Sequence, residues 1–259
     1  MLSSISAVIT DLDGTLLNEN RALSPYTVSV LSRCRRQGIL VWIATARPLR
    51  IVREWLPELV YDAIAVHNGA RVYAGGRCIA RRQMPAAAWK ETVSRLQAYQ
   101  PQPDIAVEIE ETLYANYDVA SLWPSVSYHP FTDTDSLPDC PADKLLVLSS
   151  ALTDMERYRP ALAPDCHMQL SERTAAMIMH TGASKANAIA ACCRFYGIRP
   201  EQTAAFGDDY NDIAMLQNAG IGIAVSNGEE EVKQAADLLI GSNQEDSVAR
   251  WIETHLLRG

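Results

Sequence analysis

The segment that decides the fold is residues 7–15, which read Ala-Val-Ile-Thr-Asp-Leu-Asp-Gly-Thr. Its apolar first half predicts a buried strand over residues 5–10, and two carboxylates, Asp11 and Asp13, follow where that strand ends. Two like charges at the rim of a core do not stabilise a fold, since burying either one unpaired is costly. We therefore expect a counter-cation or a shared proton beside this pair.

The chain has 259 residues, which is enough for one large domain or two modest ones. Hydrophobic residues make up 48% of it, which is enough for a substantial core. The formal net charge of −8 disfavours nucleic acid as the main partner. We see neither a signal-peptide pattern nor an apolar run long enough to span a bilayer, so we expect a cytoplasmic protein without a membrane partner. The six cysteines form no C-x-x-C pair, and we expect them to be small apolar fillers in a reducing compartment.

Strands and helices alternate at both ends of the chain. In the first part we predict a helix capped by Ser24-Pro25 and ended by Gly38, and further elements over residues 39–44, 48–56 and 63–66, with a hairpin around Gly75-Gly76. In the last part the predicted elements cover residues 184–197, 203–206, 212–218, 221–225, 229–235 and 238–240, and Asn243 is expected to cap a terminal helix. This alternation predicts a parallel sheet with helices on both faces.

The middle of the chain has a different pattern. A helix is predicted over residues 86–99 and a second one opening at Thr153, and the predicted strands cover residues 105–109, 112–117, 145–148, 168–170 and 175–179. We therefore expect an α/β fold with a Rossmann-like parallel-sheet core. That core would comprise residues 1–82 and 182–259, with a second α/β domain inserted at 83–181.

Polar residues follow several predicted core strands, at the edge of the sheet where ligands of open parallel sheets bind. Lys185, at the start of a predicted helix, is expected to point toward the same edge. The residues that follow the strands are Asp11, Asp13, Thr45, Arg47 and the run 207–212 (Gly-Asp-Asp-Tyr-Asn-Asp). A calcium loop is excluded as an alternative for the first pair, because its sixth and twelfth positions would be Leu16 and Ala22 instead of Gly and Glu.

Taken together, these motifs resemble the haloacid dehalogenase (HAD) superfamily, and within it the Cof-type subfamily IIB. The motifs that carry the resemblance are Asp11-Leu12-Asp13-Gly14-Thr15-Leu16, Ala44-Thr45-Ala46-Arg47, Asn68-Gly69, Lys185, Gly207–Asp212 and Met215-Leu216. The chain departs from the usual pattern at Ala46 and at Ala186, where the family often has Gly. Neither change removes a functional group, and we expect the turn at Ala46 to persist if its φ is negative.

The resemblance implies a phosphatase that acts through an aspartyl-phosphate, with Asp11 as nucleophile and Asp13 as general acid and base. Thr45 and Lys185 would act on the transferring phosphoryl group. The phosphate-binding set implied by the family is Asp11, Thr45, Ala46, Arg47, Lys185 and Asn211. Mg²⁺ would be held by Asp11, Asp13 through its backbone carbonyl and Asp208, and supported by Asp209, Asn211 and Asp212.

The chemistry of the residues agrees with this interpretation. A phosphate ester and a carboxylate nucleophile are both anionic, so positive charge must lie between them. Mg²⁺ prefers the hard oxygen ligands that the acidic residues supply, and the sequence has no cluster of His or Cys that would favour a softer metal. The expected partner is a small-molecule phosphate ester, and the expected assembly is a monomer or a small homo-oligomer.

The family resemblance further implies that the inserted segment is a cap that excludes water and selects the substrate, a sugar phosphate in our first hypothesis. Arg173 and the acidic residues Glu108, Glu110 and Glu111 are candidates for substrate contact, although solvent-facing strand or loop positions are the more expected placement for them. Two alternatives remain open. One is a phosphomutase, which typically carries its cap between the first two motifs, whereas one predicted helix fills that interval here. The other is a non-catalytic metabolite-binding regulator, which would not need to retain the full set of reactive groups.

Overall fold

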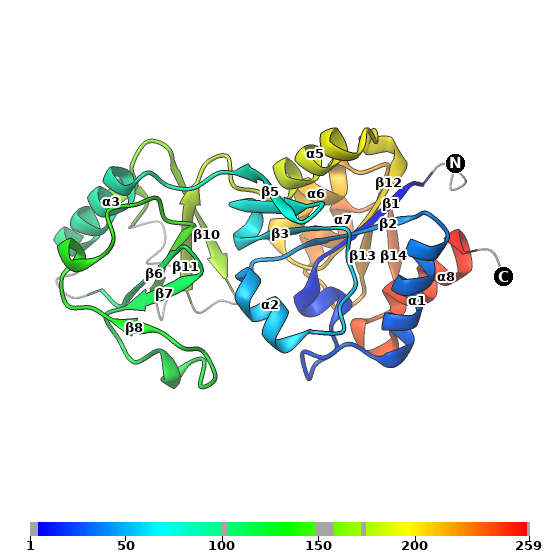
Figure 1. Cartoon of the computed structure of the whole chain (residues 1–259), viewed down its shortest axis with the longest axis horizontal. Coiled ribbons are helices and arrows are strands. Elements are labelled where there is room, and N and C mark those ends of the chain that lie inside the picture. Colours follow the sequence, from blue (N-terminus) through cyan, green and yellow to red (C-terminus); the bar gives the residue numbers. More distant parts are fainter. Residues whose placement is uncertain (1–4, 100–102, 149–157, 172–174, 258–259) are drawn as a thin grey trace. The chain divides into compact units, whose positions relative to one another are not determined.

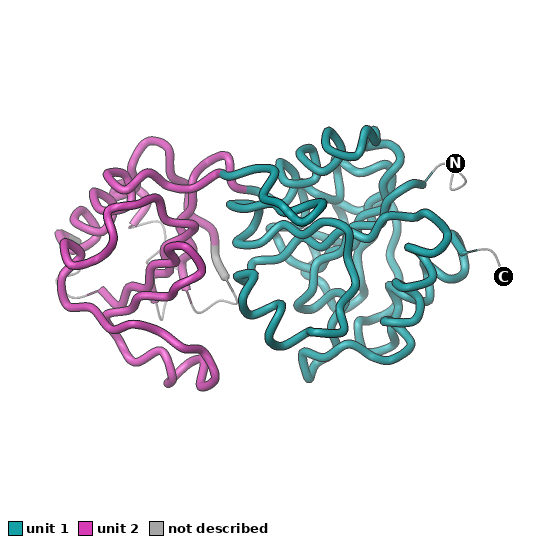
Figure 2. The backbone as a smooth tube through the Cα atoms, in the orientation of Figure 1, with its two compact units in different colours: residues 1–81, 184–259 teal, residues 82–183 magenta. Residues whose placement is uncertain are grey.

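The structure is a computed structural model, and it describes the chain except for residues 1–4, 100–102, 149–157, 172–174 and 258–259 (Figure 1). The chain divides into two compact units (Figure 2). Unit 1 comprises Met1–Arg81 and Ser184–Gly259, and unit 2 comprises Arg82–Ala183. The expected helix start at Thr153 and the candidate residue Arg173 lie outside the described residues.

Unit 1 is built on an 8-stranded sheet of order β14-β13-β12-β1-β2-β3-β4-β5. The strands are β1 (Ala7–Thr10), β2 (Leu40–Ala44), β3 (Ala63–Val66), β4 (Arg71–Ala74), β5 (Arg77–Arg81), β12 (Thr203–Gly207), β13 (Ile221–Val225) and β14 (Leu238–Ile240). All pairings from β14 to β3 are parallel, which confirms the predicted parallel-sheet core. The expected hairpin forms β4 and β5, which extend the same sheet antiparallel at one edge.

Helices cover both faces of this sheet (Figure 1). One face carries α1 (Pro25–Arg36), α2 (Leu49–Trp55) and α8 (Ser247–Leu256), and the other carries α5 (Lys185–Tyr196), α6 (Ile213–Asn218) and α7 (Glu230–Ala235). Neighbouring residues of β1 show the division, because Val8 packs with the first group of helices and Ile9 with the second. Such two-sided burial explains why the strands are continuous apolar runs.

The helix caps of α1 and α5 confirm two local predictions. The Oγ of Ser24 accepts a hydrogen bond from the backbone N–H of Thr27 at 3.0 Å. The Oγ of Ser184 does the same for the N–H of Asn187 at 3.1 Å, and α5 ends at Gly197 in the left-handed conformation. Each serine satisfies one of the backbone donors that a helix start leaves without a partner.

The predicted cap at Asn243 is wrong. Asn243 opens a short 3₁₀ turn, Asn243–Glu245, in which Glu245 accepts a hydrogen bond from the backbone N–H of Ser242. Asp246 then takes a left-handed conformation with φ of 53°, and α8 begins at Ser247. A left-handed residue cannot continue a right-handed helix, so the capping signal in the sequence produced one turn and the helix starts after it.

Unit 2 is a 6-stranded sheet of order β10-β11-β9-β6-β7-β8 with helix α3 (Ala86–Tyr99) packed against one face. The strands are β6 (Ile105–Ile109), β7 (Thr112–Ala115), β8 (His129–Pro130), β9 (Lys144–Leu148), β10 (Cys166–Ser171) and β11 (Ala175–His180). Trp89, Val93 and Leu96 of α3 bury their side chains in one apolar cluster with Val107 of β6. The strands and the helix are those that the sequence predicted, and the pairing of β7 with the short β8 was not predicted.

Of the three acidic candidates of unit 2, Glu108 differs from its expected placement, whereas Glu110 and Glu111 lie in a turn. Glu108 is only 3% exposed, and it lies opposite Lys144 in the register of β6 and β9, so it is not a solvent-facing strand residue. Glu110 and Glu111 form the turn between β6 and β7, with φ of 49° and 64°. Positive φ at both central residues matches the twist that a two-residue hairpin requires.

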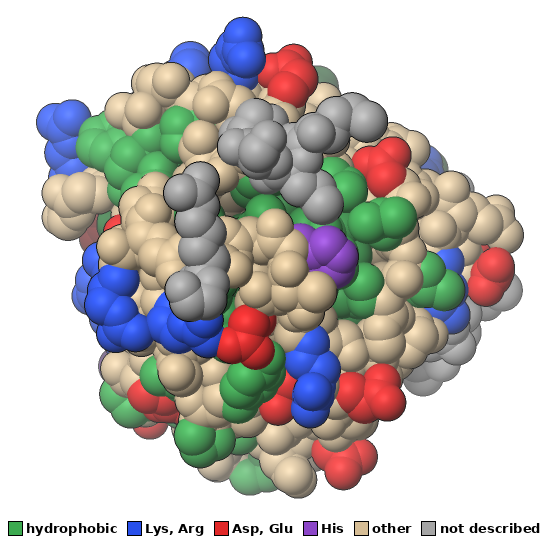
Figure 3. Space-filling view, turned by 90° about the vertical axis from the view of Figure 1, so that its right-hand side faces the viewer, with side chains coloured by type: hydrophobic (Ala, Val, Ile, Leu, Met, Phe, Trp, Pro, Cys, Tyr) green, Lys and Arg blue, Asp and Glu red, His purple; other side chains and the backbone are tan. Residues whose placement is uncertain are grey.

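None of the helices in the described part of the chain combines the length and the apolar character that a membrane span requires. None of the six cysteines, all of which lie in the described part of the chain, forms a disulfide, and four of them are buried, as expected of small apolar fillers. On the face drawn in Figure 3, the acidic and basic side chains that the structure describes are interspersed, and no extended patch of one charge covers it.

Candidate active site

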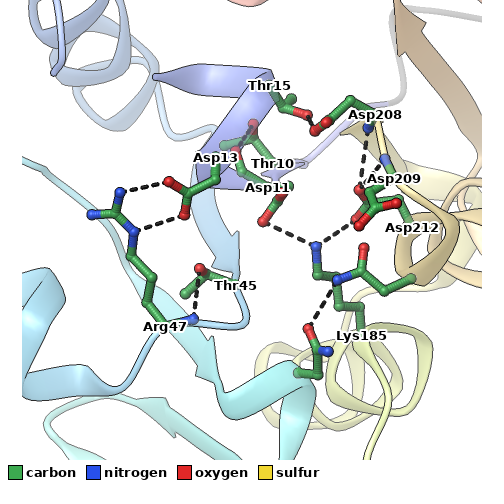
Figure 4. Close-up of polar contacts among 12 residues, drawn as sticks. Thr10, Asp11, Asp13, Thr15, Thr45, Arg47, Lys185, Asp208, Asp209 and Asp212 are labelled. Atoms are coloured by element: carbon green, nitrogen blue, oxygen red, sulfur yellow. Dashed lines mark hydrogen bonds and ion pairs between the residues drawn. The ribbon is translucent and has the colours of Figure 1, made fainter. Parts of the chain in front are cut away.

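The carboxyl ends of β1, β2 and β12 bring the predicted polar residues together (Figure 4). Thr10 lies opposite Phe206 on one side and opposite Ile43 on the other. The residues that follow on each strand therefore emerge at the same edge of the sheet, as the rule for open parallel sheets requires. Asp11 continues β1, and its backbone N–H donates to the carbonyl of Phe206 at 3.1 Å.

Lys185, the first residue of α5, places its ammonium group between two carboxylates. Its Nζ lies 2.9 Å from the Oδ1 of Asp11 and 2.7 Å from the Oδ1 of Asp212. All three side chains are buried, and those of Lys185 and Asp212 have no exposed area. Because buried charges are stable only when paired, this lysine is an integral part of the acidic cluster.

The pKa values of the pair reflect this environment. Burial raises the pKa of Asp11 well above its ordinary value, Lys185 opposes that shift, and the carboxylates of Asp212, Asp208 and Asp13 add to it. Burial would lower the pKa of Lys185, but the charges of Asp11 and Asp212 outweigh it and raise that pKa. Lys185 is therefore held in its charged form, and any further positive charge near Asp11 would favour the ionised form of that carboxyl group.

Asp208, which follows β12, lies against the loop that begins at Asp11. Its Oδ1 accepts a hydrogen bond from the hydroxyl of Thr15. Burial, with the neighbouring charge of Asp212, raises the pKa of Asp208 to about 7. Gly14 makes this approach possible, because its φ is +79° and a Cβ at that position would lie 2.2 Å from the Oδ2 of Asp208. A side chain at this position of the Asp-x-Asp-Gly motif would collide with Asp208, which explains why the motif has a glycine there.

Asp212 holds the loop that carries Asp208. Its Oδ2 accepts hydrogen bonds from the backbone N–H groups of Asp208 at 3.1 Å and Asp209 at 3.2 Å, while its Oδ1 faces Lys185. Asp209 uses its own carboxylate to accept from the backbone N–H of Tyr210 at 2.8 Å. Burial raises the pKa of Asp209 as well. Asp212 therefore ties the loop to the lysine, and Asp209 contributes to the shape of the turn.

Asp13 turns toward Arg47, which follows β2 (Figure 4). The Nε of Arg47 lies 2.7 Å from the Oδ2 of Asp13, and its Nη2 lies 2.5 Å from the Oδ1. The guanidinium also stacks on the ring of Trp55, 5.5 Å from the ring centroid. Its Nη1 is buried and has no hydrogen-bond partner among the described residues. The two-point contact fixes the direction of the Asp13 carboxylate and leaves one arginine donor available.

Thr45 is completely buried at the end of β2. Its backbone N–H donates to the carbonyl of Ala65 at 2.9 Å, and its Oγ1 accepts from the N–H of Arg47 at 3.1 Å. The hydroxyl proton of Thr45 thus remains available for donation. Ala46 has a negative φ and Ala186 lies within α5, so the backbone accommodates both departures from the family pattern.

A fourth strand end also contributes to the site. Asn68, which follows β3, accepts a hydrogen bond at its Oδ1 from the Nδ2 of Asn211 at 3.1 Å. The Oδ1 of Asn211 is buried and has no hydrogen-bond partner among the described residues. The NH₂ group of Asn211 points at Asn68, so the carbonyl oxygen is the end of the amide that stays available. This oxygen is an acceptor, which suits a hydroxyl or a water rather than a phosphate dianion.

Sequence reasoning missed Asn227, which follows β13. Its Nδ2 donates to the carbonyl of Gly14 at 2.7 Å, and its Oδ1 accepts from the backbone N–H of Asn243 at 2.9 Å. It thereby braces the loop after Asp11 against the C-terminal part of the chain. An asparagine directly after a predicted core strand, at the same edge as the other polar residues, was a signal that could have identified it.

The acidic cluster has the composition of a site for a hard divalent cation. Asp11, Asp208 and Asp212 each offer a carboxylate oxygen, and these atoms lie within 4.8 Å of one another. Lys185 already neutralises part of the charge of Asp11 and Asp212, whereas Asp208 has no basic side chain at ion-pair distance among the described residues. Oxygen donors with excess negative charge fit Mg²⁺.

Comparison with known proteins identifies the family of the chain. The model of the haloacid dehalogenase-like hydrolase family matches residues 8–252 of the chain. The 5-amino-6-(5-phospho-D-ribitylamino)uracil phosphatase YitU of Bacillus subtilis is 30% identical, with 95% of each protein covered. The pyridoxal phosphate phosphatase YbhA of Escherichia coli is 27% identical and matches 95% of this chain and 97% of its own length.

A solved structure has the same fold. The subclass IIB sugar phosphatase BT4131 superposes with a TM-score of 0.83 at 24% identity, over 96% of this chain and 98% of its own. The family match covers nearly all of unit 1 and unit 2, and the similar proteins are named as phosphatases. The chain belongs to the haloacid dehalogenase-like hydrolases, and it is a phosphatase of that superfamily.

Proposed function

We propose that this phosphatase hydrolyses a small phosphate monoester in two steps, with Asp11 as the nucleophile. The observation that carries the proposal is the buried ion pair of Asp11 with Lys185, next to the carboxylate of Asp208. An isolated buried carboxylate with a raised pKa would be a poor nucleophile at neutral pH. Lys185 favours the ionised form of Asp11 and orients its carboxylate.

In the first step, an Asp11 oxygen forms a bond to phosphorus while the bond from phosphorus to the ester oxygen breaks. Lys185 neutralises charge on the transferring group, and the Thr45 hydroxyl, already held by Arg47 N–H, donates to one of its oxygens. The leaving alkoxide takes its proton from Asp13. Arg47 holds the Asp13 carboxylate in one orientation through two hydrogen bonds. The side chain therefore loses little conformational entropy when it reaches the geometry for proton transfer.

In the second step, a water molecule attacks the phosphorus of the phosphoaspartate and the Asp11 carboxylate departs. Asp13, now ionised, accepts the proton of that water, so the proton it gave in the first step is restored. The products are an alcohol and inorganic phosphate. The free Nη1 of Arg47 and the hydroxyl of Thr45 are the donors that we assign to the bound phosphate or to the ester oxygen.

We assign Mg²⁺ as the cofactor on the donor chemistry of Asp11 and Asp208, together with the backbone carbonyl of Asp13. When bound, the cation supplies the positive charge that lets the carboxylate and the phosphate dianion approach each other. Asp212 supports this set indirectly, because both of its oxygens already serve Lys185 and the backbone of the 208–212 loop. The pKa of Asp208, raised to about 7, is consistent with a carboxylate that needs a cation.

We infer that the substrate is a small phosphorylated metabolite and that sugar phosphates and sugar-alcohol phosphates are its first class. The name of YitU specifies a phosphorylated ribityl chain and that of YbhA a pyridoxal phosphate, both small phosphate esters. We further infer that the inserted region, residues 83–181, acts as the cap that selects among them.

The decisive experiment measures phosphate release from a panel of sugar, sugar-alcohol, nucleotide and pyridoxal phosphates, with Mg²⁺ and with EDTA. Asp11→Asn removes the nucleophile, and we expect turnover to fall by about 10⁴-fold or more without loss of the folded state. Activity that survives in Asp11→Asn contradicts the assignment. Hydrolysis in ¹⁸O-labelled water separates the alternatives, since label in inorganic phosphate excludes a phosphomutase, and zero turnover over the whole panel favours a non-catalytic binder.

A further inference from the structure

The turn between β3 and β4 has an unusual backbone. Val66 and Arg71 pair across the hairpin, and the residues His67, Asn68 and Gly69 between them have φ of 49°, 54° and 91°. Glycine adopts such values freely, but two consecutive left-handed residues with side chains are strained. His67 and Asn68 are also buried, with 0% and 1% exposure, so contacts within the protein, and not hydration, hold this conformation.

The strained backbone directs two N–H groups at the loop that follows β2. The N–H of His67 donates to the carbonyl of Arg47 at 3.1 Å, and the N–H of Asn68 donates to the carbonyl of Thr45 at 2.9 Å. These are the residues that present the free hydroxyl proton and the free guanidinium donor of the site. The turn therefore holds the backbone of that loop at two positions, the carbonyls of Thr45 and Arg47.

The same turn contacts the two other segments that carry site residues. The Oδ1 of Asn68 accepts from the Nδ2 of Asn211, in the loop that carries Asp208. A Cβ on Gly69 would lie 2.3 Å from the carbonyl oxygen of Ser184, so the start of α5 packs directly on the turn. Lys185 is the next residue, and its position depends on that close approach.

We propose that Asn68 is a positioning residue of this site, which orients the Asn211 amide so that its buried carbonyl accepts a hydrogen bond from a water or a substrate hydroxyl. This proposal rests on the proposed function. The Oδ1 of Asn211 has no partner among the described residues, and a buried acceptor without a donor is costly. Asn68 holds the NH₂ end of the amide, so rotation of the Asn211 side chain would break that hydrogen bond.

The test separates the side chain of Asn68 from its backbone. Asn68→Gly keeps a backbone that tolerates positive φ and removes the side chain with its amide, and Asn211→Ala removes the partner amide. Arg21→Gly is the matched control, because Arg21 also has a positive φ, of 56°, but is exposed in a loop of unit 1. We expect Asn68→Gly to lower kcat about tenfold with KM within about twofold, and Arg21→Gly to leave both unchanged.

The double variant Asn68→Gly/Asn211→Ala distinguishes a positioning role of Asn68 from a purely structural one. If Asn68 acts through Asn211, then Asn68→Gly has no further effect on kcat in the Asn211→Ala background. Losses that multiply, to about a hundredfold, contradict the proposal. So does an Asn68→Gly variant with the kcat of the wild type.

A readout that does not depend on turnover uses orthovanadate with Mg²⁺, because the hydroxyl groups of protonated vanadate can donate to the Oδ1 of Asn211. We expect vanadate to raise the Tm of Asn68→Gly less than that of the wild type, and equal shifts overturn the proposal. The two proposals fail separately. If the wild type is active and loses that activity in Asp11→Asn but keeps it in Asn68→Gly, only the positioning role is refuted. If the wild type is inactive, the phosphatase reaction is refuted, and the vanadate comparison decides on the role of Asn68.

Discussion

The Nζ of Lys185 lies 2.9 Å from the Oδ1 of Asp11, and both side chains are buried. This one cation faces a cluster that also contains Asp212 and Asp208. The cluster therefore has an excess of negative charge whenever its carboxylates are ionised. Its stability and its chemistry both depend on how that charge is compensated, by the lysine, by protons or by a divalent cation.

Replacement of Lys185 with Met should destabilise the protein strongly. The change leaves the carboxylates of Asp11 and Asp212 buried without their counter-charge, and loss of one member of a buried pair typically costs about 3–5 kcal/mol. Urea unfolding at neutral pH in the presence of EDTA measures this loss. We expect Mg²⁺ to recover part of it, because the cation supplies charge to the same carboxylates.

Lys233→Met provides the control for this prediction. Lys233 pairs with Glu230 at 4.0 Å, and the carboxylate of that pair is 70% exposed. Surface pairs of this kind contribute about 0–1 kcal/mol, so the control should unfold nearly as the wild type does. Equal stability of Lys185→Met and Lys233→Met would show that the buried pair carries no such free energy.

The pKa of Asp208 predicts how metal binding depends on pH. In the folded protein it is raised to about 7, from an ordinary value of 3.8, chiefly by burial and by Asp212. Between these values the folded state binds more protons than the unfolded state, so without metal the free energy of unfolding falls as the pH rises through this window. Protons and Mg²⁺ compete for the same carboxylate, and Mg²⁺ affinity should rise with pH until it levels off above about 7.

Thermal unfolding with and without Mg²⁺ at about pH 5.5 and about pH 8 tests this dependence. We expect a larger Mg²⁺-induced rise in Tm at the higher pH. Asp208→Asn should remove most of the metal effect at both pH values. A Mg²⁺ effect that is independent of pH would contradict the role assigned to Asp208.

Asp13→Asn should affect substrates according to their leaving groups. An alkyl phosphate needs a proton on its departing oxygen, so its turnover should fall by about 10²–10⁴-fold. p-Nitrophenyl phosphate has a good leaving group, and its first step should persist while hydrolysis of the phosphoaspartate slows, because the general base is missing. Rapid mixing should then show a burst of p-nitrophenolate close to one equivalent of enzyme, and equal losses for both substrates without a burst would exclude this role.

Gly69→Ala should be far more harmful than Gly76→Ala. Both glycines have positive φ, but a Cβ at Gly76 meets nothing within 4 Å, whereas a Cβ at Gly69 would lie 2.3 Å from the Ser184 carbonyl. The left-handed conformation alone costs an alanine about 1–2 kcal/mol. We expect Gly76→Ala to lose about that much and Gly69→Ala to lose at least twice as much, together with activity, because α5 and Lys185 must shift. Urea unfolding and phosphate release measure both, and equal losses would exclude a role for the close approach.

Local signals in the sequence predicted much of the fold. The caps at Ser24 and Ser184 form hydrogen bonds to N–H groups three residues away, and the apolar runs of the core strands are buried on both sides. The edge that gathers Asp11, Thr45 and Asp208 also followed from the strand pattern. The failure at Asn243 has a tertiary cause, since the carboxylate of the left-handed residue Asp246 accepts hydrogen bonds from the hydroxyls of Ser24 and Thr27, far away in the sequence.

The sequence by itself determined which residues end strands and begin helices, because those preferences come from interactions within a few residues of the backbone. Only the tertiary structure decided which side chains meet. The hydroxyl of Thr15 reaches Asp208, the amide of Asn68 reaches Asn211 and Glu108 is buried opposite Lys144. These contacts join segments that only the order and register of the strands bring together, and a pattern confined to one segment contains no information about them.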